Sequence, residues 1–139
     1  MHNFYQLYYH LVWSTKNREP LITAAVEELL RHYIPAKIYY LGCTCHQLGM
    51  TEDHLHLVAT IPPNVAISTL VQRVKGGSAH FVNKSLVQEY LQWQNGYGVV
   101  SFSKQALPAI KAYAANQKEH HRAGTLMAAL ESPKAASPR

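Results

Sequence analysis

The alternation of apolar and polar residues predicts a β-strand near the start of the chain, over residues 4–13 (FYQLYYHLVW). This segment is rich in aromatic and β-branched residues, which favour extended backbone. Successive side chains of a strand point to opposite faces. One face would carry Tyr5, Leu7, Tyr9, Leu11 and Trp13, and the other Gln6, Tyr8, His10 and Val12.

Helical spacing of apolar residues follows at 24–34, where Thr23 is a suitable N-cap and Pro35 is expected to end the helix. A second helix is predicted over 68–75, resuming after a Gly-Gly-Ser run as residues 79–86. The apolar positions of the first helix recur three and four residues apart. They are Val26, Leu29, Leu30 and Tyr33.

Three further strands are predicted, over residues 38–47, 54–61 and 99–102. The connection at 48–52 is short, so the first two of these strands should pair in antiparallel fashion. A Pro-Pro-Asn run ends the strand at 54–61, and a Gln-Asn-Gly-Tyr-Gly turn at 94–98 precedes the last strand.

A final helix is predicted over 104–122, with Pro108 near its start, where proline is tolerated. The resulting order is β-α-β-β-α-β plus a C-terminal helix. This order predicts an α+β, ferredoxin-like fold, an antiparallel sheet with helices on one face. Residues 1–125 are expected to form a single domain, and residues 126–139 a flexible tail.

Composition places the chain in a reducing compartment, and we expect a cytoplasmic protein. No apolar run approaches the roughly 18 residues that span a bilayer, and the N-terminus lacks the features of a signal peptide. The only cysteines, Cys43 and Cys45, are too close in sequence to favour a disulfide. A zinc site with His46 is an alternative, but a second ligand pair at zinc-finger spacing is missing, so buried strand residues are favoured.

The chain carries 13 Lys and Arg against 8 Asp and Glu, a formal charge of +5, which favours anionic partners such as nucleic acid. Basic residues dominate two segments, one around residues 73–84 and one within 104–122. The candidate phosphate contacts are Arg73, Lys75, Lys84, Lys104, Lys111 and Lys118. Four aromatic residues are candidates for stacking on unpaired bases or, alternatively, for the core: Tyr8, Trp13, Trp93 and Tyr97.

Two histidines interrupt the apolar strand at 54–61. His54 and His56 are two residues apart and therefore project from the same face, which suits a metal site; a solvated or hydrogen-bonded pair is the alternative. In the last helix, Tyr113 and Gln117 are four residues apart and share a helical face. Gln offers a neutral oxygen to a hard cation such as Mg²⁺ or Mn²⁺, and Tyr offers a phenol that can act as a nucleophile.

The set of motifs resembles the single-tyrosine transposases of the insertion-sequence 200/605 type, within the HUH (His-hydrophobe-His) endonucleases. The REP-associated tyrosine transposases, a branch of that family, have similar motifs toward the C-terminus, WQNGYG and NQKEHH in this chain. The resemblance extends over residues 4–122. It rests on YYHLVWSTKNREPLIT, MTEDHLHLVATIPP, VKGGSAHFVNK, WQNGYGVVSFS and YAANQKEHH.

The resemblance implies that His54 and His56 hold a divalent metal ion, Mg²⁺ or Mn²⁺, together with Gln117. Tyr113 would be the nucleophile that forms a 5′-phosphotyrosine link to DNA. The implied substrate is single-stranded DNA with hairpins. The resemblance implies neither a small-molecule substrate nor binding to a membrane. Relatives act as homodimers whose active sites combine the histidines of one subunit with the tyrosine helix of the other.

Several alternatives stay open from the sequence. His10 and Asp53 are each either close to the site or purely structural, and His120 and His121 suit the helix dipole better than catalysis. Histidine-triad hydrolases would need a third histidine at the position of Val58. The main functional alternative is a domesticated protein that binds DNA hairpins without moving its own gene.

Overall fold

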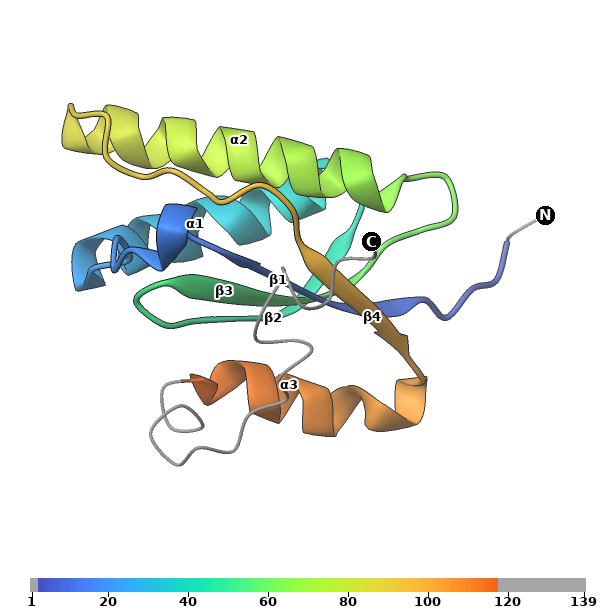
Figure 1. The fold of residues 1–139 in the computed structure, drawn as a ribbon. Helices are drawn as coiled ribbons and strands as arrows, with labels where there is room; N and C mark the ends of the chain where they lie inside the picture. The colour runs from blue at the N-terminus through green and yellow to red at the C-terminus, as the bar shows by residue number, and fades with distance from the viewer. Residues whose placement is uncertain (1–2, 118–139) are drawn as a thin grey trace.

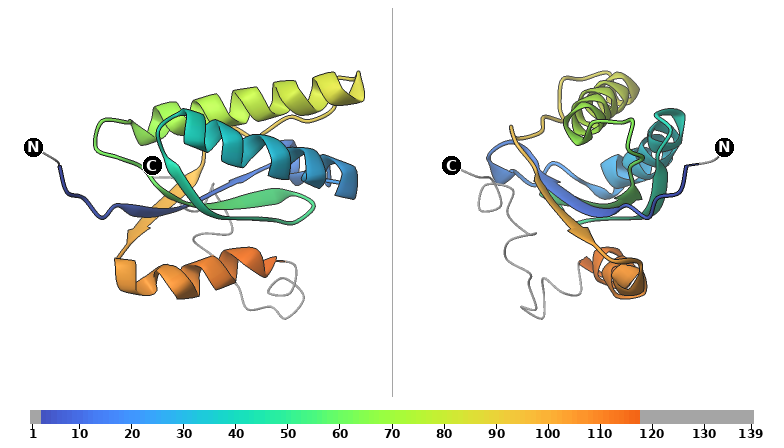
Figure 2. Two further views of the ribbon diagram at one scale, coloured as in Figure 1. Left: turned by 180° about the vertical axis from the view of Figure 1, so that it is seen from behind. Right: turned by 90° about the vertical axis from the view of Figure 1, so that its right-hand side faces the viewer.

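The computed structural model describes residues 3–117 and contains a four-stranded antiparallel sheet in the order β2-β3-β1-β4. Helices α1 and α2 cover one face of the sheet and α3 lies against the other (Figures 1 and 2). The ferredoxin-like arrangement predicted from the sequence is therefore confirmed. The bounds are β1 Tyr8–Ser14, α1 Ala24–Tyr40, β2 Thr44–Met50, β3 His54–Thr60, α2 Ile67–Leu86, β4 Gly98–Phe102 and α3 Leu107–Ala115, with short 3-10 turns at Lys16–Arg18 and Lys104–Ala106.

The two faces of the central strands have different roles. Leu11 and Trp13 of β1, with Leu55 and Leu57 of β3, belong to the hydrophobic core beneath α1 and α2. The alternate residues of the same strands point the other way, toward the face that α3 covers. The alternation predicted for the first strand is thus confirmed for the core side, although the strand begins at Tyr8 rather than at residue 4.

Helix α1 continues through Pro35 to Tyr40, so the prediction that Pro35 ends it is wrong. Proline removes one hydrogen bond, at a cost of about 3 kcal/mol in a helix interior. Ile34 and Ile38 flank it on the same face and are both fully buried, and burying two such side chains offsets that cost. Just past the end of the helix, Gly42 has a φ of 83° and forms a Schellman motif, in which the Gly42 N–H donates to the Tyr39 carbonyl oxygen and the Cys43 N–H donates to that of Ile38.

The predicted strand at 38–47 is consequently displaced, because residues 38–40 belong to α1 and β2 starts at Thr44. Helix α2 is continuous across Gly76 and Gly77 instead of breaking there. A Cβ at Gly77 would overlap the Tyr33 hydroxyl of α1, so this glycine lets the two helices approach. Glycine at position 77 is therefore explained by the packing of α2 on α1, and it does not interrupt the helix.

The last predicted helix, 104–122, begins as a 3-10 turn, and α3 proper starts at Leu107 with Pro108 in its first turn, as predicted. The C-cap of α3 is Asn116. Lys118, His120, His121 and the predicted tail at 126–139 lie outside the described residues. Within residues 3–117, the helices are too short or too polar to cross a bilayer.

Gly49 sets how closely α3 packs on the sheet. It lies in β2 directly opposite His56 of β3. A Cβ at this position would overlap the backbone carbonyl oxygen of Ala114, one residue after Tyr113. Because the obstacle is backbone rather than a flexible side chain, α3 can keep its present position only if residue 49 is glycine.

Gly49→Ala is expected to destabilise the protein by about 1–3 kcal/mol, the usual cost of overpacking a well-packed contact. The matched control is Gly76→Ala, since a Cβ on the exposed Gly76 would meet nothing within 4 Å. That control should be neutral or stabilising by about 0.5–1 kcal/mol, because alanine favours a helix interior. The free energy of unfolding in urea checks both. Equal stability of the two variants would mean that α3 does not depend on this contact.

Candidate active site

Three histidines meet on the sheet face beneath α3. His54 and His56 of β3 are completely buried, and His10 of β1 is 1% exposed. The ring centroids of His54 and His56 are 5.2 Å apart, and those of His10 and His56 are 4.9 Å apart. The two β3 histidines therefore share a face, as their spacing predicts. They are buried and hydrogen-bonded rather than solvated, so burial rules out only the solvated form of the alternative interpretation.

Helix α3 brings Tyr113 over this cluster. The Tyr113 ring lies edge-on to His56 at 5.9 Å and to His10 at 6.1 Å, measured between ring centroids. Gln117, one turn further along, is 1% exposed and its Nε2 donates a hydrogen bond of 2.7 Å to the Tyr113 carbonyl oxygen. The structure thus brings His54, His56 and Tyr113 together within a single chain, and it places the buried Gln117 one turn beyond Tyr113.

The donor set of this region fits a divalent cation. The Gln117 Oε1 atom is buried, and none of the described residues donates a hydrogen bond to it. A buried oxygen without a partner costs about 1–3 kcal/mol, and a cation would satisfy it. Two imidazoles and an amide oxygen suit Mn²⁺, and the oxygen suits Mg²⁺.

Residues 3–117 contain no group of three or more His, Cys, Asp or Glu side chains that could hold a metal, so the amide oxygen of Gln117 would be the third protein donor. The zinc alternative at Cys43, Cys45 and His46 finds no support in this part of the chain. Cys43 is buried just before β2, and Cys45 is half-buried within it. His46 instead hydrogen-bonds the Thr60 hydroxyl at 2.7 Å.

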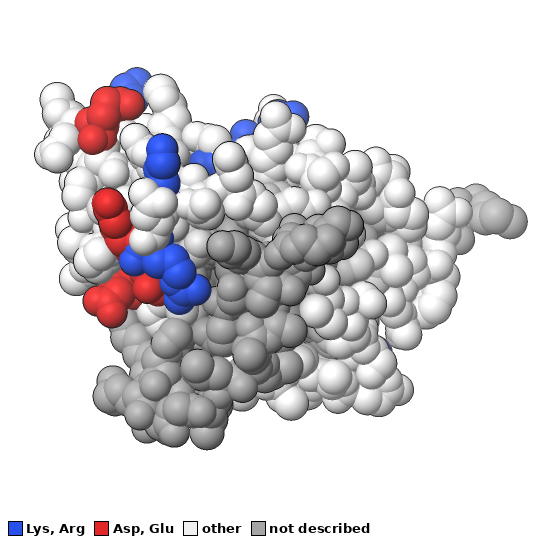
Figure 3. Space-filling model, viewed as in Figure 1, with Lys and Arg blue, Asp and Glu red and all other residues white. Residues whose placement is uncertain are grey.

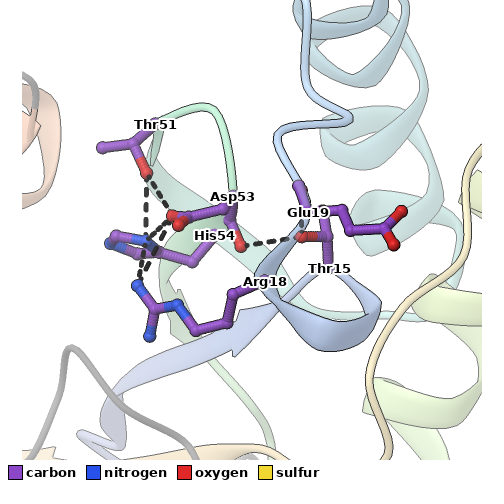
Figure 4. A network of polar contacts seen from close by, with 6 residues as sticks. All are labelled: Thr15, Arg18, Glu19, Thr51, Asp53 and His54. Atoms are coloured by element: carbon purple, nitrogen blue, oxygen red, sulfur yellow. Dashed lines mark hydrogen bonds and ion pairs between the residues drawn. The ribbon is translucent and has the colours of Figure 1, made fainter.

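A polar network contacts the Nδ1 atom of His54 (Figure 4). The His54 Nδ1 atom lies 2.8 Å from Asp53 Oδ1 and 3.0 Å from Thr51 Oγ1. Arg18 Nη2 donates to the same Asp53 oxygen at 3.4 Å. Asp53 is therefore the partner of a candidate ligand histidine, one of the two alternatives left open by the sequence. Sequence spacing gave no signal for Arg18, which is 35 residues away from Asp53.

The Asp53 contacts make stability depend on pH in the acid range. Partial burial raises the pKa of its carboxyl group, but the hydrogen bond from His54 and the charge of Arg18 outweigh burial and lower the pKa to about 2. An unfolded Asp has a pKa of about 3.9. The ionised carboxylate therefore stabilises the fold above pH ~4, and this contribution is lost as pH falls through about 2.

Asp53→Asn is accordingly expected to lower the free energy of unfolding by about 1–2 kcal/mol at neutral pH. The difference from the unsubstituted protein should shrink between pH ~5 and ~2, since the carboxylate then becomes protonated in both states. Urea unfolding across this range measures it. A difference that is constant with pH would show that the carboxylate charge contributes nothing.

The candidate phosphate contacts divide between the two sides of the sheet. Arg73 and Lys84 are exposed on α2, whereas Lys104 and the half-buried Lys111 lie on the α3 side. On the face drawn in Figure 3, acidic side chains of the described residues lie beside basic ones. Lys75 Nζ donates to the carbonyl oxygens of Gln94 and Gly96, at 2.6 and 2.9 Å, and so fastens that loop to α2. Burial lowers its pKa.

The aromatic candidates for base stacking are largely used in packing. Trp13 is completely buried and meets Trp93 edge-on at 6.1 Å. The Trp93 indole nitrogen donates to the Ser78 hydroxyl at 3.0 Å. Tyr97 is partly buried against the core, and Tyr8 stacks on Phe102. For Trp13 the core interpretation is confirmed.

Comparisons with known proteins agree on one family. The family model described as "Transposase IS200 like" matches residues 3–117. The ISDra2 transposase TnpA of Deinococcus radiodurans is 28% identical over 121 residues, which cover 83% of this chain and 86% of that protein.

Solved structures show the same fold. A crystal structure of a candidate transposase from Deinococcus radiodurans R1 has a TM-score of 0.68 and 25% identity, covering 84% of this chain and 95% of the other. A REP-associated tyrosine transposase bound to a REP hairpin has a TM-score of 0.61 and 15% identity, covering 87% of this chain and 74% of the other. At the latter identity the likeness concerns the fold alone.

Proposed function

The chain belongs to the IS200-like transposase family, and we propose that it cleaves and rejoins single-stranded DNA through a covalent bond between Tyr113 and a 5′ phosphate. The observation that carries this proposal is the position of the Tyr113 ring, 5.9 Å from the His56 ring and above a buried pair of histidines. A core tyrosine would not require two buried imidazoles beside it, nor, one turn further along the helix, a buried amide oxygen to which none of the residues 3–117 donates a hydrogen bond.

The proposed reaction begins with the Tyr113 phenol, which loses its proton as its oxygen attacks the scissile phosphorus. A bond forms between the Tyr113 oxygen and phosphorus, and the bond from phosphorus to the 3′ oxygen breaks. The departing oxygen takes up a proton and leaves as a 3′-OH. Because the phosphodiester is exchanged for another ester, a DNA 3′-OH can later attack the phosphotyrosine and rejoin a strand without ATP.

His54, His56 and Gln117 are proposed to hold the divalent ion, Mg²⁺ or Mn²⁺, which when bound polarises the phosphate. The three side chains are buried, so their donor atoms are held by the surrounding packing. Asp53 orients His54 through the 2.8 Å contact to its Nδ1 atom. This leaves the far side of the His54 ring for the ion.

We further propose that the working form is a homodimer that acts on hairpin-bearing single strands. The covering of the histidines by α3 of the same chain supports an active site that one chain can assemble. In a dimer, the same packing would let α3 of one subunit cover the histidines of the other. A mixture of a histidine variant and a tyrosine variant tests which chain supplies the tyrosine.

The test is formation of a covalent adduct. The protein is incubated with labelled single-stranded hairpin DNA from the flanks of its own gene, with Mn²⁺ or Mg²⁺, and resolved on denaturing gels. We expect a protein-DNA adduct that does not form when EDTA is present from the start, and a peptide containing Tyr113 linked to phosphate in mass spectrometry. Hairpin binding without any adduct would instead identify a domesticated DNA-binding protein.

Phosphate contacts should show in the salt dependence of DNA binding. Lys84→Ala is expected to reduce the slope of log K against log salt by about 0.7–1, the value for one lost phosphate contact. Lys84→Arg, which keeps the charge, serves as the control and should retain the slope. Fluorescence anisotropy at several salt concentrations measures it, and an unchanged slope in the Ala variant removes Lys84 from the interface.

A further inference from the structure

His10 has an unusual partner for a buried histidine. It lies in the middle of β1, 1% exposed, with its Nε2 atom 2.7 Å from the Nδ1 atom of His56. The strand register pairs His10 with Val58 and Val12 with His56, so the two histidines are diagonal neighbours on one face. Their rings are inclined by 49°. This contact joins a residue near the start of the chain to one of the two histidines of the candidate site.

We propose that His10 is a positioning residue that fixes the tautomer and orientation of His56, an inference that rests on the proposed function of His56. A nitrogen-nitrogen contact of this length requires one proton between the two atoms. Either His56 donates from Nδ1, or His10 donates from Nε2. The two cases differ in what they leave at the other nitrogen of His56.

If His56 donates, its Nε2 atom keeps a lone pair and is able to bind a metal ion. If His10 donates to a neutral His56, the Nε2 atom of His56 carries the proton and cannot bind one. Metal binding therefore requires the first arrangement, in which the Nδ1–H group of His56 donates to His10 Nε2. His10 must then carry its own proton at Nδ1, so that its Nε2 lone pair holds His56 in the tautomer that can bind the ion.

The neighbouring histidine shows why this selection matters. His54 faces the Asp53 carboxylate, which when ionised only accepts hydrogen bonds, so the proton of His54 is held at Nδ1. Burial beneath α3 keeps water from acting as the alternative partner of either ring. Asp53 and His10 thus hold the two histidines of β3 in the same tautomer, one through charge and one through a second imidazole.

The first measurement is the tautomer of His56 in the metal-free protein, from the ¹⁵N chemical shifts of labelled histidine at mildly alkaline pH. We expect the Nδ1–H form in the unsubstituted protein and in His10→Gln, whose amide oxygen can still accept. His10→Phe keeps an aromatic side chain but removes the nitrogen acceptor, and should shift His56 toward the Nε2–H form that free histidine favours. Finding Nε2–H in the unsubstituted protein would overturn the proposal.

The second measurement is Mn²⁺ affinity by titration calorimetry. His10→Phe should weaken binding about 10- to 100-fold, the usual effect of losing the partner of a ligand histidine. The control is His46→Phe, which removes a histidine bonded to Thr60 instead and should leave the affinity unchanged. His10→Gln should recover most of the lost affinity.

These outcomes separate the inference from the proposed function. Absence of Mn²⁺ binding in the unsubstituted protein would contradict the proposed metal site, while the tautomer result would still test the role of His10. Normal Mn²⁺ binding in a folded His10→Phe variant would leave the metal site intact and overturn the positioning role.

Discussion

Tyr113→Phe is expected to abolish the covalent protein-DNA adduct and to reduce strand cleavage by on the order of 10⁴-fold or more, as loss of a nucleophile does in other covalent enzymes. The change removes one oxygen and keeps the ring that packs against His56 and His10 at about 6 Å. Tyr113 is 9% exposed, so the aromatic packing and hence the fold should be preserved. Adduct on denaturing gels and cleavage in single-turnover assays measure the effect.

Two measurements make this result specific. DNA hairpin binding by the Phe variant should match that of the unsubstituted protein, which shows that chemistry rather than substrate binding is lost. Tyr33→Phe is the matched control, because Tyr33 lies on α1 at the opposite face of the sheet and stacks on Phe81. Undiminished cleavage by Tyr113→Phe would show that another group is the nucleophile.

The expectations that rest on alternation along strands were accurate, because side-chain direction in a strand depends only on local geometry. His54 and His56 share a face, and Leu55 and Leu57 enter the core, as the spacing predicts. Errors arose where tertiary packing outweighs local preference. Pro35 does not end α1, since Ile34 and Ile38 on either side of it are both buried.

The partners of the site residues could not be predicted from spacing. His10 and His56 are 46 residues apart, and Arg18 and Asp53 are 35 apart. Such contacts depend on the register between β1 and β3, and a shift of one residue would turn each side chain to the other face. Likewise, the need for glycine at position 49 is visible only once α3 is placed on β2. The sequence indicates candidate residues for the chemistry, and the fold determines which other residues contact them.

His56→Ala is expected to weaken Mn²⁺ binding and to lower strand cleavage by at least about 10²-fold, because it removes a proposed metal ligand. His10→Phe, in contrast, leaves this ligand in place and only changes how it is oriented. His56 is completely buried, so the Ala variant leaves a cavity and its folding must be checked by urea unfolding. His56→Asn, which fills more of the space, separates loss of the ligand from loss of packing. Removal of metal with EDTA should reproduce the activity loss in the unsubstituted protein and change the His56 variants little further.

Mixing His56→Ala with Tyr113→Phe decides how the site is assembled in a dimer. Each variant lacks one half of the proposed machinery and should be inactive alone. If the tyrosine helix of one subunit serves the histidines of the other, a mixed dimer contains one site with both halves intact, and adduct should form on the His56→Ala chain. If each α3 serves its own chain, as the 5.9 Å approach of Tyr113 to His56 within one chain allows, both sites of the mixed dimer lack a component and no adduct forms. Tagging the two variants to different lengths identifies the chain that carries the DNA, because the adduct then migrates at a different position for each.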